Sequence, residues 1–500
     1  MSNKNRKKMR TQSVSTSMNR ICGYLFFAAI TMIMPFYYEN KYFNMLQAKG
    51  HVIQFLVCTL LPITAMIYLL GCAMDYKKKE LTAWNWKNCN YMDMALTMFG
   101  IATLVSWLGC KDRDTSLWGM KVWCVGAAIL VGLVLFYWFS SRSLYLTEYT
   151  WIPVGIVNGI IFTISIYHSA GVDLLGMHER IVEKQYYTYI STIGNINWFS
   201  GYLCLLVPLF IVLFLNSEKR MLTIFYFIIS SLAMVNIVLC ASDSVFVGIG
   251  SCLFFFVPYM LGKEQRIRRG FLVIATYGIS LSIVNFAPCF AAKKETMDGV
   301  AASVLSPDIA FPFVGIGVLG YIAVRLWWKK LNEKTIQRIV YIIDGILLIT
   351  IIGMLIYNIS IFDDKWGTKR GLIWKESIRA FGTFDFREKL FGIGPEMLGN
   401  CYRGIRDKFT YQVLCAHSEF LQFLLSVGLV GAGSWIAMWI GLLTEYFRRK
   451  IWKTDRIVLF LPLAAYMGQS FFNSPMALTI SMLFVMLACY RSTEDACKPI

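Results

Sequence analysis

The chain has 500 residues, of which 57% are hydrophobic and 16% charged, and its mean hydropathy is +0.55. This composition excludes a water-soluble globule, because apolar runs of about 17–22 residues, each long enough to cross a bilayer, recur along the chain. The formal net charge of +18 does not indicate a nucleic-acid partner, because the basic residues lie in short segments between the apolar runs.

The apolar runs predict an all-α fold: a polytopic membrane helical bundle of about 14 spans with one large extracytoplasmic loop. We expect spans near residues 21–38, 52–73, 91–109, 119–139, 150–168, 198–215, 221–240, 244–261, 271–286, 307–326, 339–357, 418–444, 457–473 and 475–490. The chain then divides into a basic cytoplasmic N-terminus (1–20), a membrane domain with the first eleven spans (21–357), the large extracytoplasmic loop (358–417), the last three spans (418–490) and a cytoplasmic tail (491–500).

The placement of lysine and arginine sets the expected orientation. If residue 1 is cytoplasmic and each span is crossed in turn, most of the 48 basic residues fall in cytoplasmic segments, as the positive-inside rule requires of short loops. Residues 1–38 resemble the basic and apolar parts of a secretory signal, but bulky Tyr37, Tyr38 and Glu39 stand where a small-residue cleavage site would be. We therefore expect a retained first span and both termini in the cytoplasm.

The large loop is the longest polar stretch between spans, and a membrane protein that shortens its other connections is expected to concentrate its chemistry there. Thr368 is placed to cap a helix over residues 369–381, which, with Trp366, would hold Trp374 and Phe381 at the membrane interface. The loop also contains a glycine-rich turn at residues 392–396, His417 at the start of the next apolar run, and the arginines Arg370, Arg379, Arg387, Arg403 and Arg406.

Several short motifs follow in order along this part of the chain. They read Arg-Gly-Leu-Ile-Trp (370–374), Leu-Phe-Gly-Ile-Gly-Pro (390–395), Ala-His-Ser-Glu-Phe-Leu-Gln-Phe-Leu (416–424) and Val-Gly-Leu-Val-Gly (427–431). Two outlying segments accompany them, Gly-Asn-Ile-Asn-Trp-Phe (194–199) and Phe-Phe-Asn (471–473). The ordered set resembles the external loop and flanking spans of the O-antigen ligase and polymerase family.

The resemblance implies a glycosyltransferase, similar in architecture to the glycosyltransferase-C superfamily, in the bacterial cytoplasmic (inner) membrane. We expect this enzyme to be metal-independent and to use no cofactor. Its donor would be a glycan linked through pyrophosphate to a polyprenyl carrier, and its acceptor a glycan or another lipid-linked molecule. Membrane lipid and a chain-length regulator are further candidate partners.

The chemistry of these residues suggests two catalytic candidates. Arg370 offers a fixed fork of donors to a pyrophosphate leaving group. His417 lies at a helix N-terminus, where the macrodipole disfavours imidazolium, so the neutral ring is expected to accept a proton. The resemblance implies that the substrate-binding residues are Asn195, Trp374, Arg379, Gly392, Gly394, Glu396, Arg403, Arg406, Ser418, Glu419 and Gln422.

Three further points are left open by the sequence. Many family members carry an arginine where this chain has Ser242-Asp243-Ser244, so Arg379, Arg403 and Arg406 are alternative candidates for a second phosphate-binding arginine. Asp112 and Asp114 form an Asp-x-Asp pattern, which we interpret as a solvated charge cluster and not a metal site. Cys401 and Cys415 are able to pair if the loop is outside the cell.

We consider three functions. The leading one is a polymerase that joins lipid-linked repeat units, and its close rival is a ligase that moves a finished glycan to a different acceptor. The third, a non-enzyme, is a flippase or exporter of lipid-linked oligosaccharides, which the large loop and the scarcity of ionisable residues within spans disfavour. The remaining histidines, His51, His168 and His178, are expected to be structural.

Overall fold

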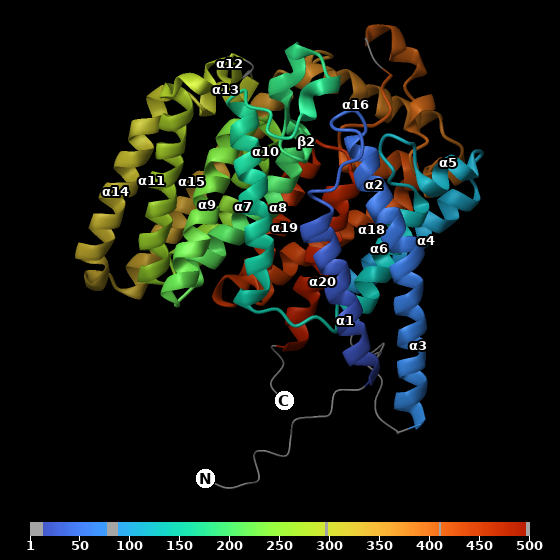
Figure 1. The fold of residues 1–500 in the computed structure, drawn as a ribbon, viewed down its shortest axis with the longest axis horizontal. Helices are drawn as coiled ribbons and strands as arrows, with labels where there is room; N and C mark the ends of the chain where they lie inside the picture. The colour runs from blue at the N-terminus through green and yellow to red at the C-terminus, as the bar shows by residue number, and fades with distance from the viewer. Residues whose placement is uncertain (1–13, 78–88, 296–298, 410–411, 497–500) are drawn as a thin grey trace.

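The structure is a computed structural model that describes residues 14–77, 89–295, 299–409 and 412–496, and it is almost entirely helical (Figure 1). Its α-helices are α1 Val14–Ala28, α2 Met45–Phe55, α3 Leu61–Lys77, α4 Tyr91–Leu108, α5 Arg113–Trp118, α6 Ala127–Ser140, α7 Trp151–Ser169, α8 Ile196–Asn216, α9 Arg220–Cys240, α10 Asp243–Met260, α11 Glu264–Phe286, α12 Ala291–Lys294, α13 Gly299–Val304, α14 Pro307–Trp327, α15 Glu333–Ser360, α16 Trp366–Thr383, α17 Phe386–Phe391, α18 Glu419–Arg448, α19 Ile457–Ser470 and α20 Ala477–Ala496. The prediction of an all-α fold is confirmed. Of the predicted terminal segments, residues 1–13 and 497–500 lie outside the described residues.

Short elements connect or interrupt these helices. Two are π-helical, η1 Ala29–Ile33 and η2 Leu56–Leu60, and the others are 3-10 helices: η4 Glu148–Thr150, η5 Met177–Arg180, η6 Glu183–Thr188, η7 Pro288–Phe290, η8 Trp328–Lys330, η9 Leu398–Asn400, η10 Arg403–Lys408 and η11 Ile451–Lys453. The strands in the described part of the chain, β1 Tyr189–Ile190 and β2 Gly194–Asn195, pair antiparallel just before α8.

Many of the helices are suited to a membrane. Ten stretches among the described residues are long and apolar enough to cross one: Met45–Met74, Tyr91–Leu108, Glu148–Ser169, Ile196–Asn216, Arg220–Cys240, Asp243–Met260, Glu264–Phe286, Pro307–Lys330, Glu333–Ser360 and Glu419–Arg448. Four further apolar helices are shorter: Asn19–Ile33, Ala127–Ser140, Ile457–Ser470 and Ala477–Thr493. The chain therefore has the helices of a multi-pass membrane protein, while the count of about fourteen spans stays a prediction.

One predicted span, residues 119–139, begins late in the structure. Residues 119–126 form turns, and the helix α6 starts only at Ala127. The backbone N–H groups of Met120 and Val125 donate to the Glu396 carboxylate at 2.8 and 3.2 Å. This anchor fixes the turns before α6, which at 1.5 Å per residue extends only about 21 Å against a hydrocarbon core of roughly 30 Å.

The helix α8 lies at the centre of the bundle. It packs against α9, α10 and α19, and residues 199–210 are all buried. A helix that is apolar on all sides is expected to be surrounded by other helices. The predicted motif at residues 194–199 leads into α8, so it lies at the beginning of this central helix.

The helices α14 and α15 form the periphery. No residue of α15 is buried, and in α14 only Ala310 and Gly317 are buried. α15 contacts α10 through apolar side chains, including Ile343 and Leu347 beside Val257. Extensive apolar exposure of this kind is what lipid contact allows, because lipid tails are themselves apolar.

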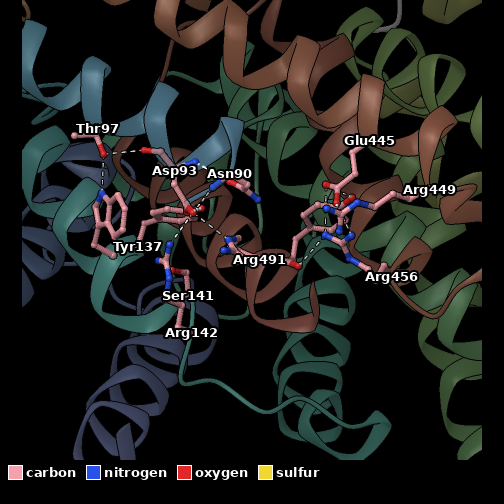
Figure 2. Close-up of polar contacts among 12 residues, drawn as sticks. Asn90, Asp93, Thr97, Tyr137, Ser141, Arg142, Glu445, Arg449, Arg456 and Arg491 are labelled. Carbon is pink, nitrogen blue, oxygen red and sulfur yellow. Dashed lines mark hydrogen bonds and ion pairs between the residues drawn. The ribbon is translucent and has the colours of Figure 1, made fainter. Parts of the chain in front are cut away.

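Two charged clusters join helices near the end of α20 (Figure 2). In the first, the fully buried Asp93 contacts Tyr137 at 2.6 Å, Arg142 at 2.6 Å and Arg491 at 3.2 Å. In the second, Glu445 contacts Arg456 at 2.6 Å, Arg449 at 3.1 Å and Tyr490 at 3.1 Å. Since removal of one partner would leave a buried charge uncompensated, these clusters fix α20 to α4, α6 and α18.

The two ends of the bundle differ. Figure 1 shows α12, α13 and α16 at one end, whereas the beginning of α1 and the ends of α3 and α20 lie at the opposite end. The segment between α15 and α18 therefore lies at the end of the bundle that carries the other long connections.

Candidate active site

The helix α18 is interrupted near its beginning. Gly428 has φ of 69° and ψ of −170°, so residues 419–427 form a first piece and residues 429–448 a second. Only glycine adopts this backbone conformation readily. The predicted span 418–444 is therefore two helices, and the second piece alone extends about 30 Å, enough to cross a bilayer core.

The glycine-rich turn packs against this interruption. The Gly394 N–H donates to the Ser426 carbonyl at 3.1 Å, and the N–H of the residue before it donates to the Leu425 carbonyl at 3.0 Å. A Cβ at Gly392 would collide with the Ser426 backbone, and a Cβ at Gly428 with the backbone of residue 390. Gly392 thus permits close backbone packing, and the Gly394 N–H is occupied by the Ser426 carbonyl, so both glycines have structural uses that argue against the predicted substrate contacts.

His417 precedes α18 in a strained turn. Its φ is 49°, a left-handed value that residues other than glycine rarely adopt. The side chain is half-buried, whereas Ala416 and Ser418 on either side are buried, and the Ser418 side chain makes no capping hydrogen bond to α18. Strained backbone under an accessible side chain is frequent at functional sites, so this geometry fits a catalytic role for His417.

The Cys415 thiol lies against His417. Burial raises the pKa of this thiol, but the neighbouring His417, its hydrogen bond to the thiol and a further hydrogen bond with Ser474 outweigh burial, and the pKa lies below its ordinary value. The His417 ring therefore has one polar partner within the protein, the Cys415 thiol.

Two buried side chains in the first turn of α18 lie close to His417 in sequence. The Gln422 amide oxygen accepts from the Ala416 N–H at 2.9 Å, so Gln422 holds the turn that carries His417 and acts as a positioning residue. Glu419 is fully buried, and one carboxylate oxygen accepts from the Tyr466 hydroxyl at 3.3 Å. The other oxygen has no hydrogen-bond partner among the described residues. The Ser470 hydroxyl also lies close to this carboxylate, and a buried carboxylate oxygen is stabilised by a proton or a hydroxyl donor.

A polar layer connects this turn to the two outlying motifs. Its hydrogen bonds join Ser242 to Asn197 at 2.7 Å, Ser242 to Ser244 at 2.9 Å, Ser244 to Ser200 at 2.7 Å, Asn473 to Ser200 at 3.4 Å and Ser474 to Gln422 at 3.5 Å. The start of α8, the start of α10 and the α19–α20 connection therefore meet beside the start of α18. Asn195 borders this layer as the N-cap of α8, accepting from the Asn197 N–H at 2.9 Å, which is a structural use of a predicted substrate-binding residue.

The helix α16 begins differently from the prediction. Gly367, Thr368 and Lys369 have φ of 58°, 61° and 71°, so regular helix starts only at Arg370. The predicted cap at Thr368 is wrong, because an N-cap residue takes an extended backbone and Thr368 is left-handed. Arg370 is half-buried and directly follows this strained turn. Both candidate catalytic residues, His417 and Arg370, are therefore associated with strained backbone.

Aromatic side chains connect α16 to α18. The ring centroid of Phe472 lies 6.1 Å from Trp366 and 6.1 Å from Trp374, and the two indoles are 5.1 Å apart. The neighbouring Phe471 packs on Phe420 of α18 at 4.4 Å. Residues 471–472 therefore lie between the helix of Arg370 and the helix that follows His417. The buried indole N–H of Trp374 has no acceptor among the described residues.

Glu396 is bound to the turns before α6. It is buried, and its two carboxylate oxygens accept the N–H groups before α6, as described above. Burial raises the pKa of Glu396 to about 8, although these two hydrogen bonds oppose the shift. Glu396 anchors the loop to α6, and its occupied oxygens argue against the predicted substrate contact.

The remaining arginines lie apart from the polar layer. Arg379 is exposed and pairs with Glu376 at 3.5 Å, Arg403 donates to Asn400 at 2.8 Å, and Arg406 is exposed. No hydrogen bond or ion pair in the described part of the chain joins any of the three to His417 or Glu419. Phe381, farther along α16, packs against Phe384 at 5.8 Å and not with the two tryptophans.

The structure also describes the cysteine pair and the Asp-x-Asp pattern named above. Cys401 and Cys415 are both free, so they do not pair. Asp112 is the N-cap of α5 and accepts from the Thr115 N–H at 3.1 Å, and no group of three or more metal-ligating side chains occurs among the described residues.

The other histidines form structural contacts. His168 and His178 lie 3.4 and 3.3 Å from the two oxygens of Asp173, and His51 lies 2.6 Å from Glu39. These pairs connect α7 and α2 to neighbouring loops.

Sequence reasoning missed the polar layer as a unit. Ser200 occurs as a single polar residue in an apolar run, a pattern typical of a locally satisfied core position. The available signal was the clustering of polar residues at the ends of three apolar runs, at residues 197–200, 242–244 and 469–474.

No family model matches the sequence, and no curated protein matches it.

Proposed function

We propose that this protein is a surface-polysaccharide polymerase, which transfers a polyprenyl-pyrophosphate-linked glycan to an acceptor sugar hydroxyl on the outer face of the bacterial cytoplasmic membrane. One observation carries the proposal: three motifs far apart in the sequence, at residues 194–199, 416–424 and 471–473, meet in the polar layer beside the helix of Arg370. A bundle needs no such convergence of polar groups for packing alone, since polar atoms in an apolar environment are costly unless they are satisfied.

The proposed reaction forms a bond from the acceptor oxygen to the anomeric carbon and breaks the bond from that carbon to the pyrophosphate. Arg370 would bind the pyrophosphate as negative charge develops on it. His417 would take the proton of the acceptor hydroxyl, which Glu419 would orient. The chain supplies all of these groups, so the proposal includes neither a metal nor a cofactor.

The proposed topology has fourteen spans, made of the ten long helices and the four shorter apolar helices. It places both termini in the cytoplasm and residues 358–417 outside. The gathering of α12, α13 and α16 at one end, opposite the end of α20, supports this arrangement, as does the distribution of basic residues.

The proposal is tested with the purified protein in lipid nanodiscs and a fluorescent polyprenyl-pyrophosphate oligosaccharide. We expect a ladder of products that differ by one repeat unit, with release of polyprenyl pyrophosphate and no effect of EDTA. His417→Ala and Arg370→Ala are each expected to reduce the rate by at least about 100-fold, the size of a lost proton transfer or electrostatic contact, while the protein still folds.

His51→Ala and Lys375→Ala are the matched controls. His51 is a histidine in a structural pair, and Lys375 is a cation on α16 that pairs with Asp364 at 2.8 Å. Both variants should polymerise normally.

The same assay on the wild type distinguishes the alternative functions. A single addition to a different acceptor would identify a ligase, and movement of the labelled donor across the bilayer without product would identify a flippase. Normal ladders from His417→Ala would remove His417 from the reaction.

A further inference from the structure

A cavity lies beside the glycine-rich turn, and His417 is not part of its lining. It is a cavity of about 460 Å³ between α16, α17 and the segment that follows α4. This volume lies within the usual range for small-ligand sites, roughly 300–1,000 Å³. Its polar and aromatic lining includes Lys111, Glu376, Arg379, Phe384, Arg387 and Asn400, and neither Arg370 nor His417 lines it.

The charges around the cavity do not cancel. Glu376 pairs with Arg379, and Glu388 accepts from the Asp385 N–H at 3.2 Å in the capping box of α17. Among the described residues, Lys111 and Arg387 form no ion pair with a carboxylate. The lining therefore holds three cations and two carboxylates, a net charge of one positive unit, and its Lys111 and Arg387 are not paired with either carboxylate.

A small neighbour leaves room for the Arg387 side chain. Its guanidinium lies against Gly109, where any Cβ would overlap it. Because Gly109 lacks a side chain, the backbone after α4 admits the guanidinium beside Lys111. The two basic side chains thus come from separate segments, α17 and the α4–α5 connection, and meet on one cavity.

The cavity is connected to the candidate active site. Ile393 lines the cavity, and its N–H donates at 3.0 Å to the Leu425 carbonyl in the first piece of α18, the piece that follows His417. A ligand of several sugar units is long enough to contact both sides of this piece.

We infer that the cavity binds an anionic sugar unit of the glycan, one that bears a carboxylate or a phosphate, and this rests on the proposed function. The guanidinium fork of Arg387 matches either anion, and the Lys111 ammonium adds a second charge. Asn400 and Thr383 supply hydrogen-bonding groups for hydroxyls, and Phe384 an apolar face for a sugar ring. The cavity selects acidic repeat units and lies apart from the bond that is formed.

Binding is measured on the full-length protein in detergent with three fluorescent tetrasaccharides: one neutral, one with a uronate and one with a phosphate diester. At least one acidic tetrasaccharide should bind about tenfold or more tightly than the neutral one, and the preferred acid identifies the anion. Arg387→Gln and Lys111→Gln should each weaken that binding by about tenfold, the size of one charge-assisted hydrogen bond.

Lys389→Gln is the matched control. Lys389 is in the same short helix as Arg387 but about 200° around it, and it does not line the cavity. It should bind acidic tetrasaccharide like the wild type, and all three variants should match the wild type in thermal stability. Equal binding of neutral and acidic tetrasaccharides, or an equal loss in Lys389→Gln, would overturn the inference.

Failure of the inference is distinguishable from failure of the proposed function. If the wild type polymerises glycan and Arg387→Gln and Lys111→Gln bind the acidic tetrasaccharides normally, the cavity proposal alone is wrong. If acidic tetrasaccharides bind as expected but no donor is ever transferred, the polymerase proposal is wrong and the cavity remains an anionic-glycan site.

Discussion

His417 and the two residues before Arg370 share an unusual backbone. His417, Thr368 and Lys369 all have positive φ, although none is glycine. A left-handed residue of this kind costs about 1–2 kcal/mol, and threonine is among the least suited because it is β-branched. The chain therefore keeps strained backbone at two places on one end of the bundle where a glycine would be more stable.

Strain and chemistry at His417 are separable by substitution. His417→Gly removes the strain, whereas His417→Ala retains it, and both remove the imidazole. We expect His417→Gly to be roughly 0.5–1 kcal/mol more stable than His417→Ala, because alanine still adopts the left-handed conformation in the folded state. Thermal unfolding in detergent compares the two. Equal stability would mean that the turn relaxes once the imidazole is absent, and a transfer activity that survives in His417→Gly would show that the imidazole is dispensable.

The buried Glu396 makes the stability of the loop depend on pH. Its pKa is about 8 in the folded protein and 4.5 ordinarily. Between these values the folded state holds a proton that the unfolded state has released, so stability falls as the pH rises and levels above about 8. We expect the melting temperature to fall across this window, and to fall less in Glu396→Gln, which cannot ionise.

Glu333→Gln is the control for this pH dependence. Glu333 is exposed at the beginning of α15, so its replacement should leave the slope of the wild type unchanged. A slope that is the same in Glu396→Gln as in the wild type would assign the pH dependence to other groups.

At the scale of elements, the interruption of α18 depends on backbone contact. Residues 390–394 contact the helix at residues 425–428. Because Gly392 and Gly428 have no side chain, the two backbones can lie directly against each other there. The first piece of α18 is thereby separated from the membrane-length second piece. Glu419 belongs to the first piece and His417 lies just before it, so their position is set by the glycine-rich turn and not by the span.

Gly428→Ala tests this role. The substitution introduces a Cβ against the backbone of residue 390 and a residue unsuited to φ of 69°, and we expect a loss of roughly 2 kcal/mol or more. Gly433→Ala, in the same helix, has open space around its Cβ and should be neutral or up to about 1 kcal/mol more stable. The measurements are the thermal unfolding temperature of both variants and the amount of each that is recovered in the membrane. Similar stability of the two variants would contradict a constrained break at Gly428.

The sequence was sufficient for the helices but not for their local interruptions. Hydropathy and periodicity run without a gap from Phe420 through Gly428, so nothing local marks the break. Thr368 likewise precedes a helical pattern as a cap would, yet Gly371 lies against the Asp363 carbonyl and the chain turns back before the helix begins. The break in α18 arises because backbone from another part of the sequence approaches it, and the turn before α16 arises because the chain folds back on itself. The spacing of residues in the sequence indicates neither contact.

The candidate site was predictable in part for a related reason. The motifs identified His417, Arg370 and Glu419 as candidates, because their residue types and order are informative. The interpretation of Gln422, Gly394 and Glu396 as substrate contacts omitted the backbone groups that they bind in the fold. A polar side chain offers the same atoms to a substrate and to an N–H, and only tertiary structure shows which of the two it meets.

On the scale of the whole molecule, α15 decides on which side of the membrane the candidate site lies. It connects η8, which ends at Lys330, to the segment that holds α16, and none of its residues is buried. If α15 crosses the bilayer, Lys330 and Asn400 are on opposite sides. Basic residues around Lys330 then favour the cytoplasm for that side, and the candidate site lies outside.

Epitope tags after Asn400 and after Lys330, in two otherwise complete chains, test this arrangement. Both residues are exposed at the ends of 3-10 helices, where an insertion disturbs little packing. We expect antibody to bind the Asn400 tag on intact spheroplasts and the Lys330 tag only after permeabilisation. Access to both tags from one side would show that α15 does not cross. The reverse pattern would place His417 and Arg370 in the cytoplasm, where a chain extended on the outer face could not be made by them.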